Sequence, residues 1–146
     1  MTDTTMSRER SGLVTGARWV LVALAGLFTL GAFTQFFLVG ISYFDNPVRW
    51  KDHADLGNAL GLLTYLIWIP AVLARAGTKV ILGSILLLVL FMAQHAFIEV
   101  DSSIVNALHP LNGSVMLVLA FWLTQRAFAL ARGEDARAHR IERATG

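Results

Sequence analysis

The chain has 146 residues, of which 55% are hydrophobic and 15% charged, and its formal net charge is +2. A soluble domain carries about 25% charged residues, so this composition excludes an ordinary soluble protein. The lack of cysteine excludes disulfides, iron–sulfur clusters and thiolate catalysis. The small net charge argues against nucleic acid as a partner.

The apolar residues gather in four blocks, each near the roughly 20 residues that a helix needs to cross a bilayer. They predict an all-α fold, a four-helix transmembrane bundle with up-down-up-down topology, over residues 19–130. Residues 1–18 are polar and predict a cytoplasmic tail that is mostly disordered. The first helix is expected at about residues 19–41, because Trp19 is typical of a membrane boundary.

The polar segments between the blocks predict where the other helices begin and end. Asn46-Pro47 indicates a turn, and Asp52 is a suitable N-cap for a second helix at about residues 53–74. Gly77 suits the position just past the end of the second helix, in a tight basic turn before a third helix at about residues 80–98. Pro110 favours the first turn of a fourth helix at about residues 109–130. Residues 131–146 form a second basic tail.

The basic residues predict the orientation of the bundle. Only Arg49 and Lys51 fall on the side of the bundle that carries the polar segments 42–52 and 99–108. Positive residues favour the cytoplasmic side, so both termini are expected to be cytoplasmic. The predicted cytoplasmic set is Arg8, Arg10, Arg18, Arg75, Lys79, Arg126, Arg132, Arg137, Arg140 and Arg143.

Polar residues also gather at the predicted outer face. At about 1.5 Å of rise per residue, His95 lies roughly 24 Å from the cytoplasmic boundary of a core about 30 Å thick. His53 and His109 open helices at about the same level. Polar side chains at membrane depth turn toward the bundle interior, so the three histidines are expected to face a common space. The same layer contains Gln35, Asp55, Asn58, Gln94, Glu99 and Asn112.

Heme b is the first candidate for that space, because neutral imidazoles from facing helices are suitable axial ligands. His53 and His109 are the preferred axial pair, with His95 as the competing ligand. Gly57 and Gly61 follow His53 at helical spacing and would give room for the macrocycle. The chain would then be a small membrane cytochrome b-like protein that takes part in electron transfer.

Other outer residues would support such a heme. Arg49 and Lys51 would pair with the propionates at the membrane surface. Gln35, Glu99 and the third histidine would tune the site or relay protons.

Other hypotheses remain open from the sequence. His95 and Glu99 are spaced i, i+4, so with His53, His109 or Asp55 they could hold a non-heme metal such as zinc, copper or iron. Histidine and glutamine could instead donate hydrogen bonds to a quinone.

A protein without any cofactor is a further alternative. It would be an accessory or assembly subunit that docks on a larger membrane complex through a face built on Gly57 and Gly61, or a homo-oligomer. No nucleophile–base pair and no phosphate-binding loop is evident, so whether the chain is an enzyme stays open.

The segment from His53 to Gly57 and the segment from His109 to Gly113 together resemble a family of small bacterial four-helix membrane proteins. The resemblance covers about residues 19–130 and implies a bacterial cytoplasmic membrane, with the lipid bilayer as the chain's surroundings. The chain is more distantly similar to histidine-bearing cytochrome b and heme A synthase modules, which implies heme binding. It lacks the duplicated half and the cysteine-containing loop of heme A synthases, and this argues against a synthase activity.

Overall fold

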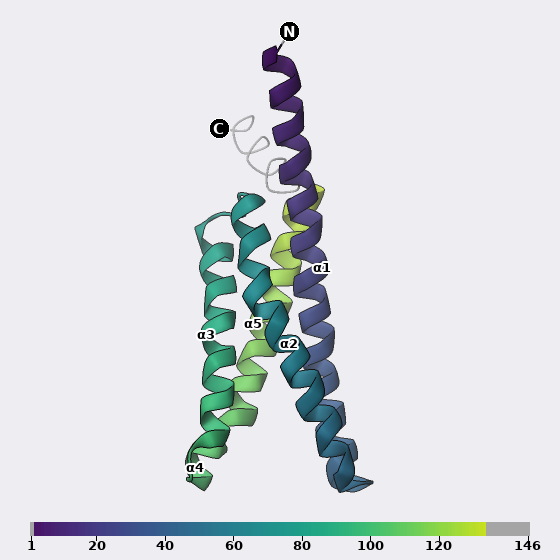
Figure 1. Cartoon of the computed structure of the whole chain (residues 1–146), viewed down its shortest axis with the longest axis vertical. Coiled ribbons are helices and arrows are strands. Elements are labelled where there is room, and N and C mark those ends of the chain that lie inside the picture. The colour runs from purple at the N-terminus through teal and green to yellow at the C-terminus, as the bar shows by residue number, and fades with distance from the viewer. Residues whose placement is uncertain (1, 134–146) are drawn as a thin grey trace, which may run out of the picture.

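The computed structural model describes the backbone of residues 2–133 and the side chains of residues 11–133. Four long helices dominate it: α1 (Thr2–Phe44), α2 (Trp50–Leu73), α3 (Thr78–Glu99) and α5 (Leu108–Arg132). Two short elements connect them, the 3-10 helix η1 (Pro47–Arg49) and the single turn α4 (Ser103–Asn106). The predicted all-α four-helix bundle is confirmed (Figure 1).

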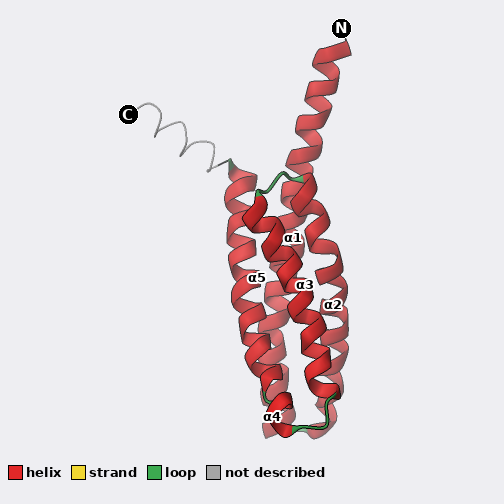
Figure 2. Ribbon diagram, turned by 90° about the vertical axis from the view of Figure 1, so that its left-hand side faces the viewer, coloured by secondary structure: helices red, strands yellow, loops and turns green. Residues whose placement is uncertain are grey.

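Each long helix neighbours two others in the bundle. α1 packs against α2 and α5, and α3 packs against the same two helices. α2 and α5 therefore occupy diagonal corners of the bundle, and so do α1 and α3 (Figure 2). Side chains on the inner faces of α2 and α5 meet across the bundle axis, rather than along a shared helix–helix seam.

The first helix is longer than expected. α1 begins at Thr2 and has 43 residues, so the predicted disordered tail is helical and rises beyond the bundle (Figure 1). No proline interrupts residues 2–44, and adding residues to an existing helix is far easier than nucleating a new one. Most of the predicted basic tail, from residue 134 onward, lies outside the described residues.

Local interactions explain where α2 and α3 begin. The side chain of Asn46 accepts a hydrogen bond from the backbone N–H of Val48 (3.0 Å) and so caps η1, which leads directly into α2. The predicted capping role of Asp52 is therefore wrong, because that residue already lies in the first turn of α2. Gly77 has φ +82°, a conformation that other residues rarely adopt, and it precedes α3 rather than ending α2.

The core is packed unevenly along the bundle axis. Toward the N-terminal end of α1, buried alanines such as Ala25, Ala71 and Ala127 let the helices approach closely. Toward the other end, α2 has no buried residue before Leu60, and α3 has none after Leu87. All four helices are therefore packed closely at one end, whereas at the other end the pair α1 and α2 separates from the pair α3 and α5 (Figure 1).

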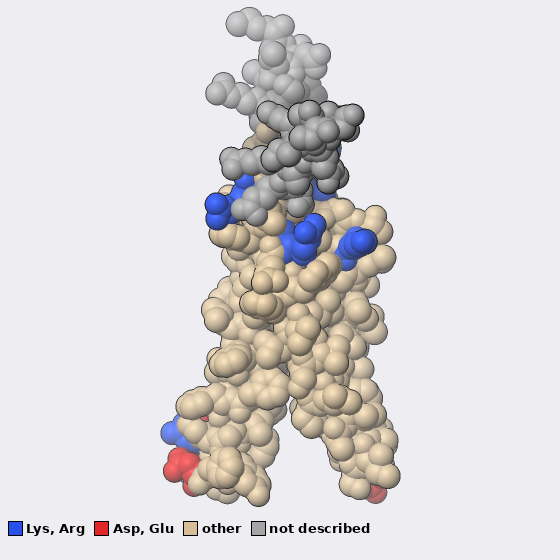
Figure 3. Space-filling model, turned by 180° about the vertical axis from the view of Figure 1, so that it is seen from behind, with Lys and Arg blue, Asp and Glu red and all other residues tan. Residues whose placement is uncertain are grey.

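Four helical stretches are long and apolar enough to cross a membrane: Ser11–Phe44, Pro47–Leu73, Thr78–Glu99 and Ser103–Arg132. Lys and Arg side chains gather at the closely packed end, while the Asp and Glu side chains visible on the face in Figure 3 lie at the opposite end. That opposite end is divided by a cleft (Figure 3). The long apolar middle with charged ends is typical of a transmembrane bundle.

Candidate functional site

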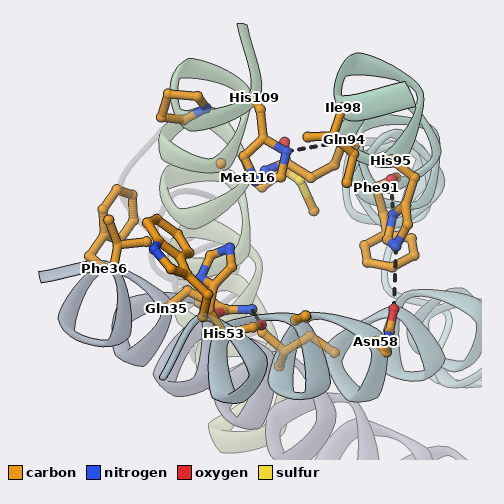
Figure 4. Close-up of a pocket in the computed structure, with 18 of the residues that line it drawn as sticks. Gln35, Phe36, His53, Asn58, Phe91, Gln94, His95, Ile98, His109 and Met116 are labelled. Atoms are coloured by element: carbon orange, nitrogen blue, oxygen red, sulfur yellow. Dashed lines mark hydrogen bonds between the residues drawn. The ribbon is translucent and has the colours of Figure 1, made fainter. Parts of the chain in front are cut away.

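The cleft leads into a cavity of about 720 Å³ among α1, α2, α3 and α5. Its walls are mainly apolar, with Phe28, Phe91 and Met116 toward the middle of the bundle. Six polar side chains point toward its outer part: Gln35, His53, Asn58, Gln94, His95 and His109 (Figure 4). The expected outer polar layer therefore divides, since Asp55 and Glu99 are exposed outside this cavity.

His53 and His109 face each other across the cavity. Their ring centroids are 6.2 Å apart and their planes are inclined by 59°. His53 lies in the first turns of α2 and His109 in the first turn of α5, so the two rings come from diagonal helices. Both side chains are half-buried.

The start of α2 determines which residue accompanies His53. Because α2 begins at Trp50, this residue and His53 are spaced i, i+3 and share one face of the helix. Their rings meet edge to face at 5.7 Å, and both line the cavity. The expected second helix began three residues later, at about His53, and so left Trp50 in the preceding polar segment.

A hydrogen-bond network fixes the orientation of His109. Its Nδ1 atom is 3.0 Å from the backbone carbonyl oxygen of Gln94. A carbonyl oxygen only accepts hydrogen bonds, so Nδ1 donates and Nε2 keeps its lone pair. The amide of Asn112 donates to the Gln94 side-chain oxygen (2.6 Å) and to the Leu90 carbonyl (2.9 Å), which joins α5 to α3 just below the histidine.

The third histidine lines the same cavity but belongs to a separate pair. His95 Nε2 is 3.5 Å from Asn58 Oδ1, and its ring lies 4.7 Å from the ring of Phe91. Figure 4 shows this pair bridging α3 and α2, away from the pair formed by His53 and His109. The expected common space exists, and within it the structure brings two of the three histidines face to face.

Two buried polar atoms at the side of His53 lack partners. Gln35 donates from Nε2 to the backbone carbonyl of His53 (3.0 Å), which ties α1 to the start of α2. The Oε1 atom of Gln35 and the Nδ1 atom of His53 are both buried, and neither has a hydrogen-bond partner among the described residues. Buried polar groups are nearly always hydrogen-bonded, so this pair indicates a place for a ligand or for a small rearrangement.

The two glycines of α2 have different surroundings. Gly57 lines the cavity, where an added Cβ would lie 3.0 Å from Gln35 Nε2. At Gly61 an added Cβ would lie 2.2 Å from Phe91 Cζ, so the aromatic ring already fills the space. The room expected for a macrocycle at Gly61 is thus taken up by helix packing, and this residue offers no free docking face.

The charged residues expected at the site lie at its edge or outside it. Arg49 is 3.8 Å from Asp52, and Lys51 pairs with Asp55 one turn further along α2. All four side chains are largely exposed.

The expected metal site is not formed. Glu99, the last residue of α3, is exposed and does not line the cavity with His95. Among the described side chains, those of residues 11–133, no three His, Asp or Glu come together in a way that could hold a metal ion. The three-ligand arrangement expected around His95 and Glu99 is therefore absent from the described part of the chain.

Part of this site lies in a segment that is similar to a known protein family. Residues 35–100 match the model of a family of unknown function (DUF6220). The matched segment contains Gln35, His53, Asn58 and His95, and it ends before His109. No curated protein and no solved structure matches the chain. The likeness to cytochrome b and heme A synthase modules therefore stays a prediction.

Proposed function

We propose that this chain is a small integral membrane cytochrome b-like protein that binds heme b between His53 and His109 and takes part in electron transfer. The separation of the two imidazoles carries the proposal. A metal held about 2 Å from one nitrogen of each ring places the ring centroids roughly 6 to 6.5 Å apart. The observed separation is 6.2 Å.

The partners of the two imidazoles also support this assignment. His109 donates from Nδ1 to the Gln94 carbonyl, and histidines that bind a metal typically donate their other ring N–H to a carbonyl in this way. It leaves Nε2 able to bind a metal. Across the cavity, a hydrogen bond from His53 Nδ1 to Gln35 Oε1 would satisfy both unpartnered atoms. It would leave Nε2 of His53 free to bind a metal, like Nε2 of His109.

The shape and lining of the cavity suit a flat apolar ligand. Its volume of about 720 Å³ lies within the usual range of about 300–1,000 Å³ for ligand sites. Phe28, Phe91 and Met116 form its apolar inner wall. Gly57 and Gly113 also line the cavity, and because they have no side chain they leave space beside the histidines. When bound, heme supplies one-electron chemistry, while the surrounding side chains set its orientation and exclude water.

The setting of the site indicates its partners. The excess of basic residues at the closely packed end supports an orientation with both termini in the cytoplasm of a bacterium, and the cavity near the outer face of the cytoplasmic membrane. The cleft opens on the side of the bundle that lipid would cover. A quinone in the bilayer or a larger membrane complex could therefore approach the site as redox partner.

The visible spectrum of the detergent-purified chain, before and after dithionite, tests the proposal. We expect a Soret band and sharp reduced α-bands that are lost in His53→Ala and in His109→Ala. His95→Ala is the matched control, because that histidine lines the same cavity outside the facing pair, and its spectrum should remain. A colourless protein from heme-replete cells that also fails to bind added hemin would refute the proposal. If the colourless protein co-purified with a larger membrane complex, the accessory-subunit hypothesis would be favoured.

A quinone site is the second candidate, favoured by the unpartnered atoms of Gln35 and His53. A histidine N–H donates to a quinone carbonyl, and a glutamine oxygen accepts from the hydroxyl of the reduced form. We expect lipid extracts of the purified protein to contain quinone in proportion to protein. The amount should fall in Gln35→Leu and persist in Gln94→Leu, and equal amounts in both variants would argue against this site.

A further inference from the structure

Hydrogen bonds near the mouth of the histidine cavity join the four long helices in two pairs. The amide of Gln35 on α1 donates to the backbone carbonyl of His53 on α2 (3.0 Å). The amide of Asn112 on α5 donates to the Leu90 carbonyl (2.9 Å) and to Oε1 of Gln94 (2.6 Å), both on α3. The pair α1 and α2 and the pair α3 and α5 are therefore each held together at this end of the bundle.

The two pairs are only weakly joined to each other at the same end. Among the described residues, one hydrogen bond crosses the cleft here, between Nε2 of His95 on α3 and Oδ1 of Asn58 on α2 (Figure 4). Its length of 3.5 Å exceeds the about 2.7–3.2 Å of a normal bond, so it is weak. The rings of His53 and His109 face each other across the cleft with their centroids 6.2 Å apart. Little therefore resists a change in the distance between the pairs.

Closer contacts join the two pairs further into the bundle. The ring of Phe91 on α3 fills the space beside Gly61 on α2. The hydroxyls of Thr29 on α1 and Thr124 on α5 are 3.0 Å apart. Toward the N-terminal end of α1, fully buried alanines such as Ala71 bring the helices close together. A movement of one pair against the other would thus pivot at this level, as in hinge motions of domains, and would displace the outer ends most.

We propose that the two helix pairs are hinged units, which open at their outer ends to admit a flat ligand from the bilayer and close when the ligand is bound. The hinge itself rests on the distribution of contacts alone, whereas closure on the ligand rests on the proposed binding of heme. His53 belongs to one pair and His109 to the other, so a ligand that both imidazoles hold links the two pairs directly. The closed arrangement is favoured to the extent that the ligand binds it more tightly than the open one.

Distances between introduced labels test the hinge, because the chain has no cysteine of its own that would be labelled as well. Asp45→Cys with Asp101→Cys places one label at the outer tip of each pair, on either side of the cleft. Asp101→Cys with Thr78→Cys labels both ends of α3 and is the matched control. All three positions are exposed. Gd³⁺ chelate labels, which withstand dithionite, report the distance distributions by double electron–electron resonance in lipid nanodiscs.

We expect the unliganded chain to give a broad distribution across the cleft and a narrow one along α3. Hemin, whose binding the Soret band of the same sample verifies, should narrow the distribution across the cleft and shift it to shorter distances. Asn58→Leu removes the weak bond across the cleft and should raise the population of the longer distances by roughly threefold, the effect of an average hydrogen bond between transmembrane helices. The distance along α3 should stay the same in every sample, which also verifies that the variants are folded.

Two results would overturn the proposal. Equally narrow distributions for both label pairs in the unliganded chain would show that no hinge exists. Bound hemin that leaves the distribution across the cleft unchanged would show that the ligand does not close it. A broad distribution across the cleft in a chain that develops no Soret band would support the hinge and count against the heme proposal, so the two proposals fail separately.

Discussion

Substitution of Gly61 by alanine tests the packing beneath the histidine cavity. The new Cβ would lie 2.2 Å from Cζ and 2.6 Å from Cε1 of Phe91, whereas carbon atoms in good contact are about 3.5 Å apart. The ring must therefore move by more than about 1 Å. Overpacking of this kind costs about 1–3 kcal/mol, and removing a helical glycine returns up to about 1 kcal/mol. We expect Gly61→Ala to lower the free energy of unfolding by about 1–2 kcal/mol.

Unfolding in detergent, followed by circular dichroism, measures this change, and Gly40→Ala is the matched control. No heavy atom lies within 4 Å of a Cβ added at Gly40, so this variant should be neutral or slightly stabilised. A double-mutant cycle with Phe91→Leu isolates the contact, because residues that touch are not additive. In the leucine background, alanine at Gly61 should cost little. The reasoning would be refuted if Gly61→Ala matched the Gly40 control, or if its cost were the same in both backgrounds.

Three further predictions concern hydrogen bonds between helices. Asn112→Leu removes two hydrogen bonds from α5 to α3. Hydrogen bonds between transmembrane helices average about 0.6 and reach about 1.7 kcal/mol each, so the free energy of unfolding should fall by about 1–2 kcal/mol. An unchanged unfolding midpoint would contradict this prediction. The hydroxyls of Thr29 and Thr124 are 3.0 Å apart, and a double-mutant cycle with valine should give a coupling energy of about 0.5–1 kcal/mol, against none if the helices do not meet there. Arg18→Met removes a bond of 3.1 Å to the Leu130 carbonyl and should cost about 1 kcal/mol in the same assay, whereas equal stability would show that the end of α5 is held by other contacts.

Most of the fold follows from the distribution of apolar and basic residues, and the errors lie at helix ends. Apolar length predicts the membrane core of a helix but not its extension into water, so α1 was expected to begin near Trp19 rather than at Thr2. The same limit displaced the start of α2 from Trp50 to His53. There the deciding interaction is the hydrogen bond from Val48 to the side chain of Asn46, a local contact that hydropathy does not report.

The site was partly predictable because helical period and depth are properties of single helices. They place His53 and His109 at one level and on inward faces, and the structure brings these two rings together. Which histidines meet depends on which helices are diagonal, and this is a property of the whole bundle. His95 lies on α3, next to α2, so it meets Asn58 instead.

Patterns of small residues were ambiguous for a different reason. A glycine in a helix leaves a space where other residues have a side chain. Whether a ligand or a neighbouring side chain fills that space depends on the surrounding helices. At Gly61 the occupant is the ring of Phe91, whereas Gly57 opens onto the cavity. The i, i+4 pair of His95 and Glu99 misled in a similar way, because the second residue ends α3 and turns to solvent.

The cavity is a consequence of how residue size changes along the bundle. At the basic end, Ala71, Ala74 and Ala127 are fully buried, and helices lined by alanine can approach closely. At the other end, the inward positions carry imidazoles and amides that hydrogen-bond to backbone carbonyls of neighbouring helices, as Gln35 and Asn112 do. These bonds join α1 to α2 and α5 to α3, the two pairs of helices that flank the cleft. Close packing of all four helices at one end, and polar contacts within each pair at the other, leave an open site between the pairs.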